Sequence, residues 1–256
     1  MRFYRILLPM LLLLMISFKG QSQRERIKSD SAFTIPMIYG FYGYQWPGAD
    51  MAENFGSNST IGPGFMVKTA SNWIMGIEYN FLFGSNVKNG HDILKGIMAS
   101  NGEIISGDGT PAVVSLFERG HTISAKFGKL IPVSKKDKNS GIFFTAGLGY
   151  IMHKIRIEVE NNSAPQLNGD YRRGYDRRSG GLMLSQAIGF MYFGQNHLFN
   201  FTLSIEAVEG WTKSYRDFYF DTMAPPEGRN FDFLIGPKIA WMLPLRQRSV
   251  SQFFYY

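Results

Sequence analysis

The sequence predicts an all-β protein: an eight-stranded antiparallel up-and-down transmembrane β-barrel with short periplasmic turns and long extracellular loops. Three observations favour this fold. Apolar residues alternate with small or polar residues in about eight segments. The connections between these segments alternate between long and short, as they do in membrane barrels. The chain is 15% aromatic and only 18% charged, yet after the N-terminus it lacks the run of ~18 apolar residues that a membrane helix needs.

The first 22 residues have the pattern of a cleaved signal peptide. Arg2 and Arg5 form a basic start, residues 6–18 form an apolar stretch too short to span a bilayer comfortably, and the small residues Gly20 and Ser22 precede the expected cleavage site. An uncleaved anchor helix is the alternative. Removing residues 1–22 takes away three of the 27 basic residues and leaves 24 against 20 acidic residues. The basic excess therefore belongs largely to the targeting segment, which argues against a nucleic-acid partner.

The mature chain is expected to have three parts. Residues 23–32 form an N-terminal periplasmic segment, residues 33–243 form the barrel, and residues 244–256 form a periplasmic tail or part of the assembly signal. The chain has no cysteine, which excludes disulfides, thiol nucleophiles, cysteine metal sites and lipidation at an N-terminal cysteine. No cofactor and no metal site are expected.

The predicted strands follow from period-two alternation, which places large apolar side chains on one face. It is clearest near the end of the chain, where Phe231, Phe233 and Ile235 alternate with Asp232 and Leu234. The expected strands are 33–46, 58–69, 73–84, 117–131, 141–157, 179–194, 198–210 and 230–243. The aromatic face is expected to meet lipid, and the small or charged face is expected to line the lumen.

The connections set the orientation of the barrel. Those at 70–72, 132–140 and 195–197 are short, and those at 47–57, 85–116, 158–178 and 211–229 are long. Residues 92–98 of the longest connection are expected to form a helical turn. Four tryptophans fall at the strand ends and are expected to form an aromatic girdle, with Trp73 and Trp241 at the periplasmic side and Trp46 and Trp211 at the outer side.

With this pattern the chain resembles the small eight-stranded outer-membrane barrels of Gram-negative bacteria, the superfamily that includes the OmpA, OmpX and OmpW types. The aromatic-rich style and the terminal residues 253–256 (FFYY) resemble barrels of Bacteroidetes. The triplets 30–32 (DSA) and 221–223 (DTM) resemble the O-glycosylation sequence of that group, which makes Ser31 and Thr222 candidate sites. The resemblance implies outer-membrane location, and contact with outer-membrane lipid, lipopolysaccharide and other outer-membrane or periplasmic proteins.

Four charged residues are expected to point into the lumen. Glu78 and Lys126 lie on adjacent strands, and so do Glu206 and Lys238. An eight-stranded barrel is only wide enough to be filled by side chains, so these charges are expected to pair and plug the lumen. A proton or ion path is the alternative, and glycines on the lumen face are expected to leave some room for it.

Neither the histidines nor the serines form a recognisable catalytic arrangement. By strand phase His153 points into the barrel and His121 points out, so the two do not converge. Some small barrels that modify lipid A use a serine and a histidine at the outer rim, but Ser124 lies deeper than His121 and on the other face. We therefore expect that the protein is not an enzyme.

The stretch 168–181 (NGDYRRGYDRRSGG) lies in the long connection between the fifth and sixth strands. Its arginines, Arg172, Arg173, Arg177 and Arg178, are expected at the outer rim, where they face lipopolysaccharide phosphates or a partner protein. An ordinary solvated loop is the alternative.

These features favour a non-enzymatic structural or accessory subunit of an outer-membrane complex for protein assembly or secretion, which docks partners through its loops. A porin-like channel for small solutes or ions is the second hypothesis, and a lipid-modifying enzyme is the third.

Overall fold

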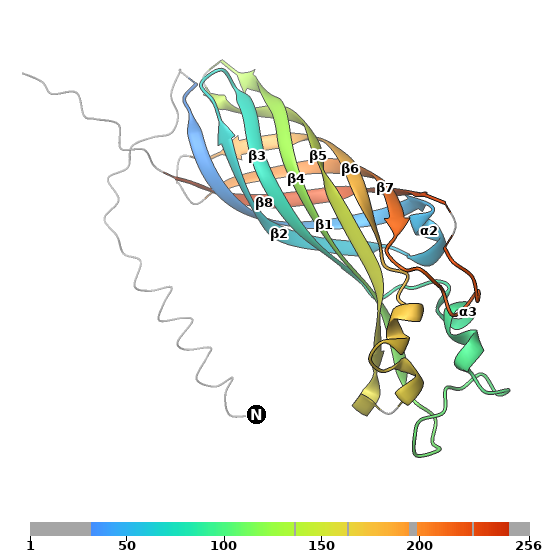
Figure 1. The fold of residues 1–256 in the computed structure, drawn as a ribbon. Helices are drawn as coiled ribbons and strands as arrows, with labels where there is room; N and C mark the ends of the chain where they lie inside the picture. The colour runs from blue at the N-terminus through green and yellow to red at the C-terminus, as the bar shows by residue number, and fades with distance from the viewer. Residues whose placement is uncertain (1–31, 136, 163, 195–198, 227, 246–256) are drawn as a thin grey trace, which may run out of the picture.

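The computed structural model describes residues 32–135, 137–162, 164–194, 199–226 and 228–245. Eight antiparallel strands form a closed barrel, in which each strand pairs with its neighbours in the sequence and β1 pairs with β8 (Figure 1). The strands are β1 (Ile35–Ala49), β2 (Asn58–Lys68), β3 (Trp73–Gly84), β4 (Val114–Ser134), β5 (Asp137–Val159), β6 (Ser179–Phe193), β7 (Asn200–Ser214) and β8 (Asn230–Pro244). The predicted fold class, an eight-stranded antiparallel up-and-down barrel, is confirmed.

Several strands are longer than predicted. β4 continues to Ser134, and β5 begins already at Asp137. The connection expected at 132–140 is therefore mostly strand. The register of the β4–β5 pairing shifts between Pro132 and Ser134. Such an irregularity is compatible with a proline, which has no N–H to donate to the ladder. β7 continues to Ser214 because its pairing with β6 persists, so Trp211 lies inside the strand rather than at its end.

All the short helices lie in the long connections. They are α2 (Met51–Asn54), α3 (Gly90–Leu94), and the 3₁₀ helices η1 (Lys95–Ile97), η2 (Glu160–Asn162), η3 (Pro165–Leu167) and η4 (Tyr171–Gly174). The helical turn expected at 92–98 is confirmed, since α3 and η1 together cover 90–97. We call the end of the barrel that carries these connections the loop end, and the opposite end the turn end.

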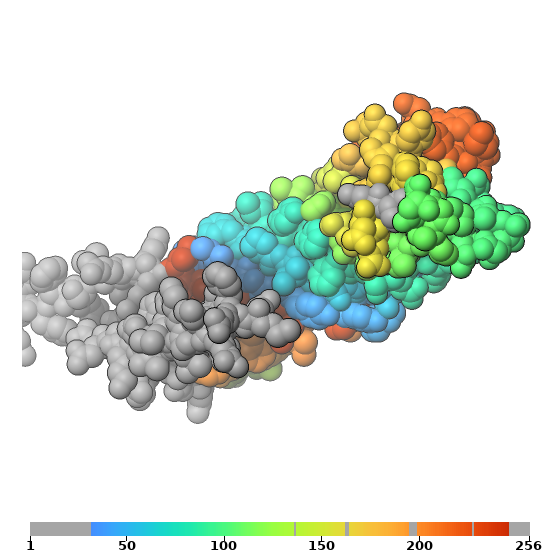
Figure 2. All heavy atoms as spheres, turned by 90° about the horizontal axis from the view of Figure 1, so that it is seen from below, coloured from blue at the N-terminus to red at the C-terminus, as the bar shows by residue number. Residues whose placement is uncertain are grey.

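The connections at the loop end pack on one another and form a cap. β4 and β5 project beyond the rim of the barrel and carry the segments 85–113 and 160–178 with them (Figure 1). In the space-filling view these segments gather at one end, together with part of the β7–β8 connection (Figure 2). A hydrophobic cluster holds the cap to the rim; it includes Ile93, Leu94, Ile104, Ile155, Leu167 and Tyr175.

Side chains alternate between the two faces of the wall. In β1 the inward residues Met37, Tyr39 and Phe41 are buried, and the outward residues Ile38 and Tyr42 are exposed. The same alternation runs along β7 and β8. The exposed outward side chains are mostly large and apolar, and include Ile77, Ile123, Phe127, Leu148, Leu182, Leu203, Ile239 and Trp241.

The sequence pattern predicts a small or charged inward face. The structure differs, because part of this face is apolar and large. At the turn end a second hydrophobic cluster fills the lumen with Met37, Tyr39, Phe41, Phe143 and Phe193, among others. The inward side chains of eight converging strands are close enough to pack across the lumen, so large apolar residues are stable there.

Some expectations concern residues that the structure does not describe. The signal peptide at 1–22, nearly all of the segment 23–32 including Ser31, and residues 246–256 of the C-terminal segment all lie outside the described residues. Among the residues described, no helix is long and apolar enough to cross a membrane.

Candidate functional site

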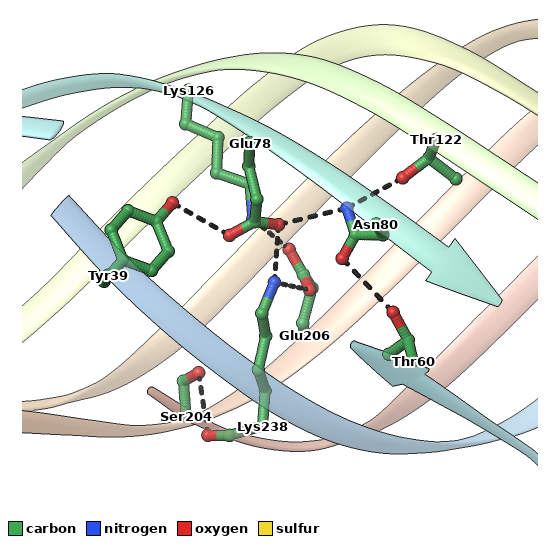
Figure 3. A network of polar contacts seen from close by, with 9 residues as sticks. All are labelled: Tyr39, Thr60, Glu78, Asn80, Thr122, Lys126, Ser204, Glu206 and Lys238. Atoms are coloured by element: carbon green, nitrogen blue, oxygen red, sulfur yellow. Dashed lines mark hydrogen bonds and ion pairs between the residues drawn. The ribbon is translucent and has the colours of Figure 1, made fainter. Parts of the chain in front are cut away.

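Four charged side chains meet at the centre of the lumen (Figure 3). Lys126 Nζ lies 2.7 Å from Glu78 Oε1 and also contacts Glu206 Oε1. Lys238 Nζ lies 2.5 Å from Glu78 Oε1 and 2.9 Å from Glu206 Oε2. Each ammonium group therefore contacts both carboxylates, and the four charges sum to zero. We call these four residues the lumen network.

The structure brings together all four residues that the sequence analysis placed in the lumen, and adds contacts that adjacency did not predict. Sequence adjacency pairs Glu78 with Lys126 and Glu206 with Lys238, because each pair lies on neighbouring strands. In the barrel, Lys126 also reaches Glu206 of β7, and Lys238 also reaches Glu78 of β3. These contacts cross the lumen between strands that do not pair with each other.

Neutral polar side chains complete the hydrogen bonding of Glu78. The Tyr39 hydroxyl donates to Glu78 Oε2 at 2.9 Å, and Asn80 Nδ2 donates to Oε1 at 3.2 Å. Asn80 is held in turn by Thr122 and Thr60. A buried charge is tolerated when opposite charges and hydrogen bonds compensate its desolvation, and here both are present. Tyr39 and Asn80 were not among the predicted lumen residues, although the phase of each strand turns them inward.

A small cavity lies on each side of the lumen network. One, on the turn-end side, has a volume of about 40 Å³, and the other, on the loop-end side, has about 10 Å³. Glu78 and Glu206 line both. The room expected at the lumen glycines is taken up by neighbours: the Tyr39 ring lies over Gly64, and Ser185 and Lys126 lie beside Gly147. The described side chains thus leave small spaces beside the lumen network.

A second polar layer lies nearer the loop end. The Asn58 amide donates to both carboxylate oxygens of Glu118, at 2.9 and 3.1 Å. His153 Nε2 lies 2.9 Å from Asp232 Oδ2, and Thr212 Oγ1 donates to the same oxygen at 2.7 Å. All five residues are buried. In the part of the chain that the structure describes, no three His, Asp or Glu side chains are grouped so that they could hold a metal ion.

The two histidines near the loop end lie on opposite faces of the wall. His153 points inward, as its phase in β5 predicts, and its ring and that of Phe55 form a T-shaped pair. His121 points outward, and its Nδ1 lies 2.6 Å from the Tyr79 hydroxyl. They therefore do not converge. Ser124 is buried on the inward face, away from His121.

Above the second layer, the mouth of the barrel holds a polar cavity of about 310 Å³. Side chains of the α2 region and of the four strands β5 to β8 line it, together with parts of the cap; they include Asp50, Glu53, Asn54, His153, Arg177 and Asp232. Asp50 is already engaged, because its carboxylate accepts a hydrogen bond from the Phe231 N–H at 2.7 Å. This hydrogen bond joins the β1–β2 connection to the start of β8.

The structure separates the four arginines of the β5–β6 connection. Arg172 donates to the Leu167 carbonyl at 3.0 Å, and Arg173 forms an exposed ion pair with Asp170. Arg177 has a positive φ of 43° and turns toward the mouth cavity, where it binds Asn54 and Asp221.

Arg178 points outward instead, over the Tyr215 ring and beside the Met152 sulfur. Tyr175 is buried against Phe220 in the cap, and this burial raises the pKa of its hydroxyl. The arginines that remain available at the surface are therefore Arg173 and Arg178.

The four tryptophans all point outward and are exposed. Trp46 pairs with Ile235 and Trp211 pairs with Phe231, toward the loop end. Trp73 and Trp241 lie toward the turn end, where Trp73 stacks on Phe127 and lies under the Lys129 ammonium at 4.5 Å. The side chains thus form two levels on the outer surface of the wall.

Of the two candidate glycosylation sites, only Thr222 is described. It is exposed in the β7–β8 connection. The adjacent Asp221 carboxylate is bound by Arg177.

Comparison with known proteins is limited to the fold. No family model matches the chain, and no curated protein matches it. Among solved structures, the attachment invasion locus protein Ail of Yersinia pestis is 8% identical, with coverage of 83% of this chain and 99% of that one and a TM-score of 0.42. Neisserial surface protein A is 10% identical, with coverage of 80% and 96% and a TM-score of 0.38. The N-terminal barrel domain of OprF of Pseudomonas aeruginosa is 9% identical, with coverage of 82% and 99% and a TM-score of 0.36.

Proposed function

We propose that the protein is a non-enzymatic, non-conducting barrel of the outer membrane that serves as an accessory subunit of an outer-membrane complex for protein assembly or secretion. The observation that carries this proposal is the closed lumen: the lumen network and the apolar cluster at the turn end leave cavities of about 40 and 10 Å³. With the interior filled, the outer surface is the part of the molecule that is free to act.

The outer surface of the wall supports a position in a membrane. Its exposed side chains between the two tryptophan levels are almost all apolar or aromatic, and a soluble protein rarely exposes so large an apolar area. In β8 the outward-facing Phe231 and Trp241 mark the two levels, and the segment 231–241 joins them. Its length matches the about 9–11 residues of a tilted transmembrane strand. Closure of the sheet supports it too, since no strand edge would meet lipid.

The cap supports protein docking at the loop end. Arg216 Nη2 lies 2.5 Å from Oδ2 of Asp176 in the β5–β6 connection. The hydrogen bonds to Asp176 raise the pKa of Arg216. Such contacts between connections keep the surface of the cap in one arrangement, which lowers the entropy lost on binding. Val113, Tyr171 and Met223 are exposed on this surface at 60%, 65% and 74%. Exposed aromatic residues and methionines are enriched in protein interfaces.

Arg173 and Arg178 are the candidates for contact with lipopolysaccharide phosphates or with a partner. The Arg178 guanidinium binds no carboxylate among the described residues, and it lies over an outward-facing tyrosine. Planar guanidinium groups suit phosphate oxygens. Thr222, exposed on the same end, remains a candidate for O-glycosylation.

Affinity purification in mild detergent tests the docking proposal. The wild type should co-purify with a defined outer-membrane or periplasmic partner. A variant with Val113→Ser, Tyr171→Ser and Met223→Ser should lose that partner, and a control with Ile61→Ser on the wall should retain it. Recovery of wild-type monomer alone would count against a subunit role.

Two further measurements test the alternatives. Planar-bilayer recording should give no conductance steps, and regular steps would favour a channel. Mass spectrometry of lipid A should be unchanged when the gene is deleted, and an altered acylation pattern would favour an enzyme.

A further inference from the structure

One polar side chain lies near the middle of the apolar outer wall. Gln186 points outward from β6, four residues from Leu182, which pairs with Trp211 of the loop-end tryptophan level. It lies six residues from Tyr192, whose partner Phe201 pairs with Trp241 of the turn-end level. Gln186 is exposed, and its amide makes no hydrogen bond to any residue that the structure describes.

Other polar side chains on the outer wall have local partners or lie near its ends. Ser59 bonds the Tyr42 hydroxyl, His121 bonds the Tyr79 hydroxyl, and Lys129 lies over Trp73. Glu209 is two residues from Trp211, at the loop-end level. Gln186 is therefore the amide that would face the hydrocarbon core without a partner, where water cannot satisfy it.

The wall around Gln186 is recessed. Gln186 pairs with Ala146 of β5 on one side and with Ala207 of β7 on the other, and the larger Phe127 and Ile235 follow in the same row. This row lies in an apolar groove of about 680 Å³ on the outside of the barrel. Small residues on a membrane-exposed surface allow the backbone of a partner to approach closely.

We propose that this groove is the interface of a parallel two-fold dimer, in which the Gln186 amides of two copies hydrogen-bond to each other. The inference rests on the membrane position proposed above. Copies inserted in the same direction are related by a two-fold axis along the membrane normal, and such an axis keeps every residue at its own height. A residue at mid-height on this axis therefore meets its own counterpart.

The side chain of glutamine fits this arrangement. It carries both a carbonyl acceptor and N–H donors, so two copies can satisfy each other reciprocally in an isologous interface. Lipid tails offer neither a donor nor an acceptor. A second copy thus satisfies the hydrogen-bonding groups of the Gln186 amide, and its own wall fills the groove.

Cross-linking tests the dimer directly, because the chain has no cysteine of its own. Gln186→Cys introduces a single thiol at the proposed interface. Ile61→Cys is the matched control, since Ile61 points outward from β2 at a similar height. Its pairing partner Tyr42 is four residues from Trp46, just as Gln186 is four residues from the partner of Trp211. A short bifunctional maleimide is the suitable reagent, because packed sheets lie about 10 Å apart.

Each variant is inserted into phosphatidylcholine vesicles at a low protein-to-lipid ratio and then treated with the reagent. We expect a covalent dimer for Gln186→Cys and monomer for Ile61→Cys. In detergent, sedimentation of Gln186→Leu should show dimerisation weakened about three- to tenfold relative to the wild type, the range that one or two hydrogen bonds between membrane-embedded side chains produce. Equal cross-linking at both positions, or none at Gln186→Cys, would overturn the dimer.

Insertion is measured separately, by flotation with the vesicles and by the gel shift of unboiled samples. A wild type that does not insert contradicts the proposed membrane function. A wild type that inserts, with Gln186→Cys remaining monomeric, contradicts the dimer alone.

Discussion

Removal of one charge from the lumen network should destabilise the barrel strongly. In Lys238→Met, Glu78 and Glu206 share the single ammonium of Lys126. Their side chains are only 2% and 5% accessible, and the adjoining cavities of about 40 and 10 Å³ hold at most a few water molecules. One negative charge therefore stays buried without compensation, and we expect a loss of about 3–5 kcal/mol in the free energy of unfolding.

A second substitution separates this charge effect from a packing effect. Lys238→Met with Glu206→Gln restores neutrality, because Lys126 then faces Glu78 alone. We expect the double variant to recover most of the lost stability, since replacement of both partners of a buried pair is often nearly neutral. The exposed pair Arg156–Glu158, whose side chains are 54% and 45% accessible, provides the control. Arg156→Met should change the free energy of unfolding by less than about 1 kcal/mol.

The assay is urea unfolding of the barrel in detergent, followed by tryptophan fluorescence and by the gel shift of unboiled samples. A loss below about 1 kcal/mol in Lys238→Met would refute the view that the network is a buried unit. A double variant that is as unstable as the single variant would show that lysine packing, including its contact with Phe41 at 3.9 Å, accounts for the loss.

Three further predictions concern the lumen, the cap and one loop. Gly64→Ala should lower the free energy of unfolding by about 1–3 kcal/mol, because its Cβ would lie 2.5 Å or less from Tyr39 ring atoms; Gly40→Ala, where a Cβ meets nothing within 4 Å, should be silent in the same urea titration. Arg177→Met leaves the buried Asp221 carboxylate without its ion pair and should speed proteolysis of the 215–229 connection, whereas Arg173→Met should not. Hydrogen bonds from Ser106 and Thr110 lower the pKa of Asp108 to about 2. Their contribution should be present above the ordinary pKa of an aspartate and be lost as pH falls through about 2, and Ser106→Ala should raise the pKa that carbon NMR measures; an unchanged pKa would contradict this assignment.

The strands were predictable because a closed barrel imposes a simple rule on its residues. Every strand has one face outward and one inward, so the pattern of period two appears in the sequence without knowledge of neighbours. The segments 58–69, 73–84 and 230–243 accordingly match β2, β3 and β8 within one residue. The start of β5 and the end of β7 were less predictable, because cross-strand hydrogen bonds continue there through polar residues with no apolar alternation.

The candidate site was predictable only in part. Phase along a strand determines that Glu78, Lys126, Glu206 and Lys238 point inward, and adjacency in the chain indicates which neighbours pair. The contacts of Lys126 with Glu206 and of Lys238 with Glu78 cross the lumen. They depend on the diameter of the closed barrel and on the relative heights of strands that never pair, and no local pattern records either quantity.

The sequence by itself determined the fold class, the order of the strands, the face that each strand turns outward and the end that carries the long connections, because these follow from local periodicity and loop length. Only the tertiary structure decided how the arginines of 168–181 are divided, with Arg177 turned toward the mouth cavity and Arg178 turned outward. It also decided that Gln186 has alanines on both sides. Both results depend on residues distant in the chain, whose proximity is created when the barrel closes.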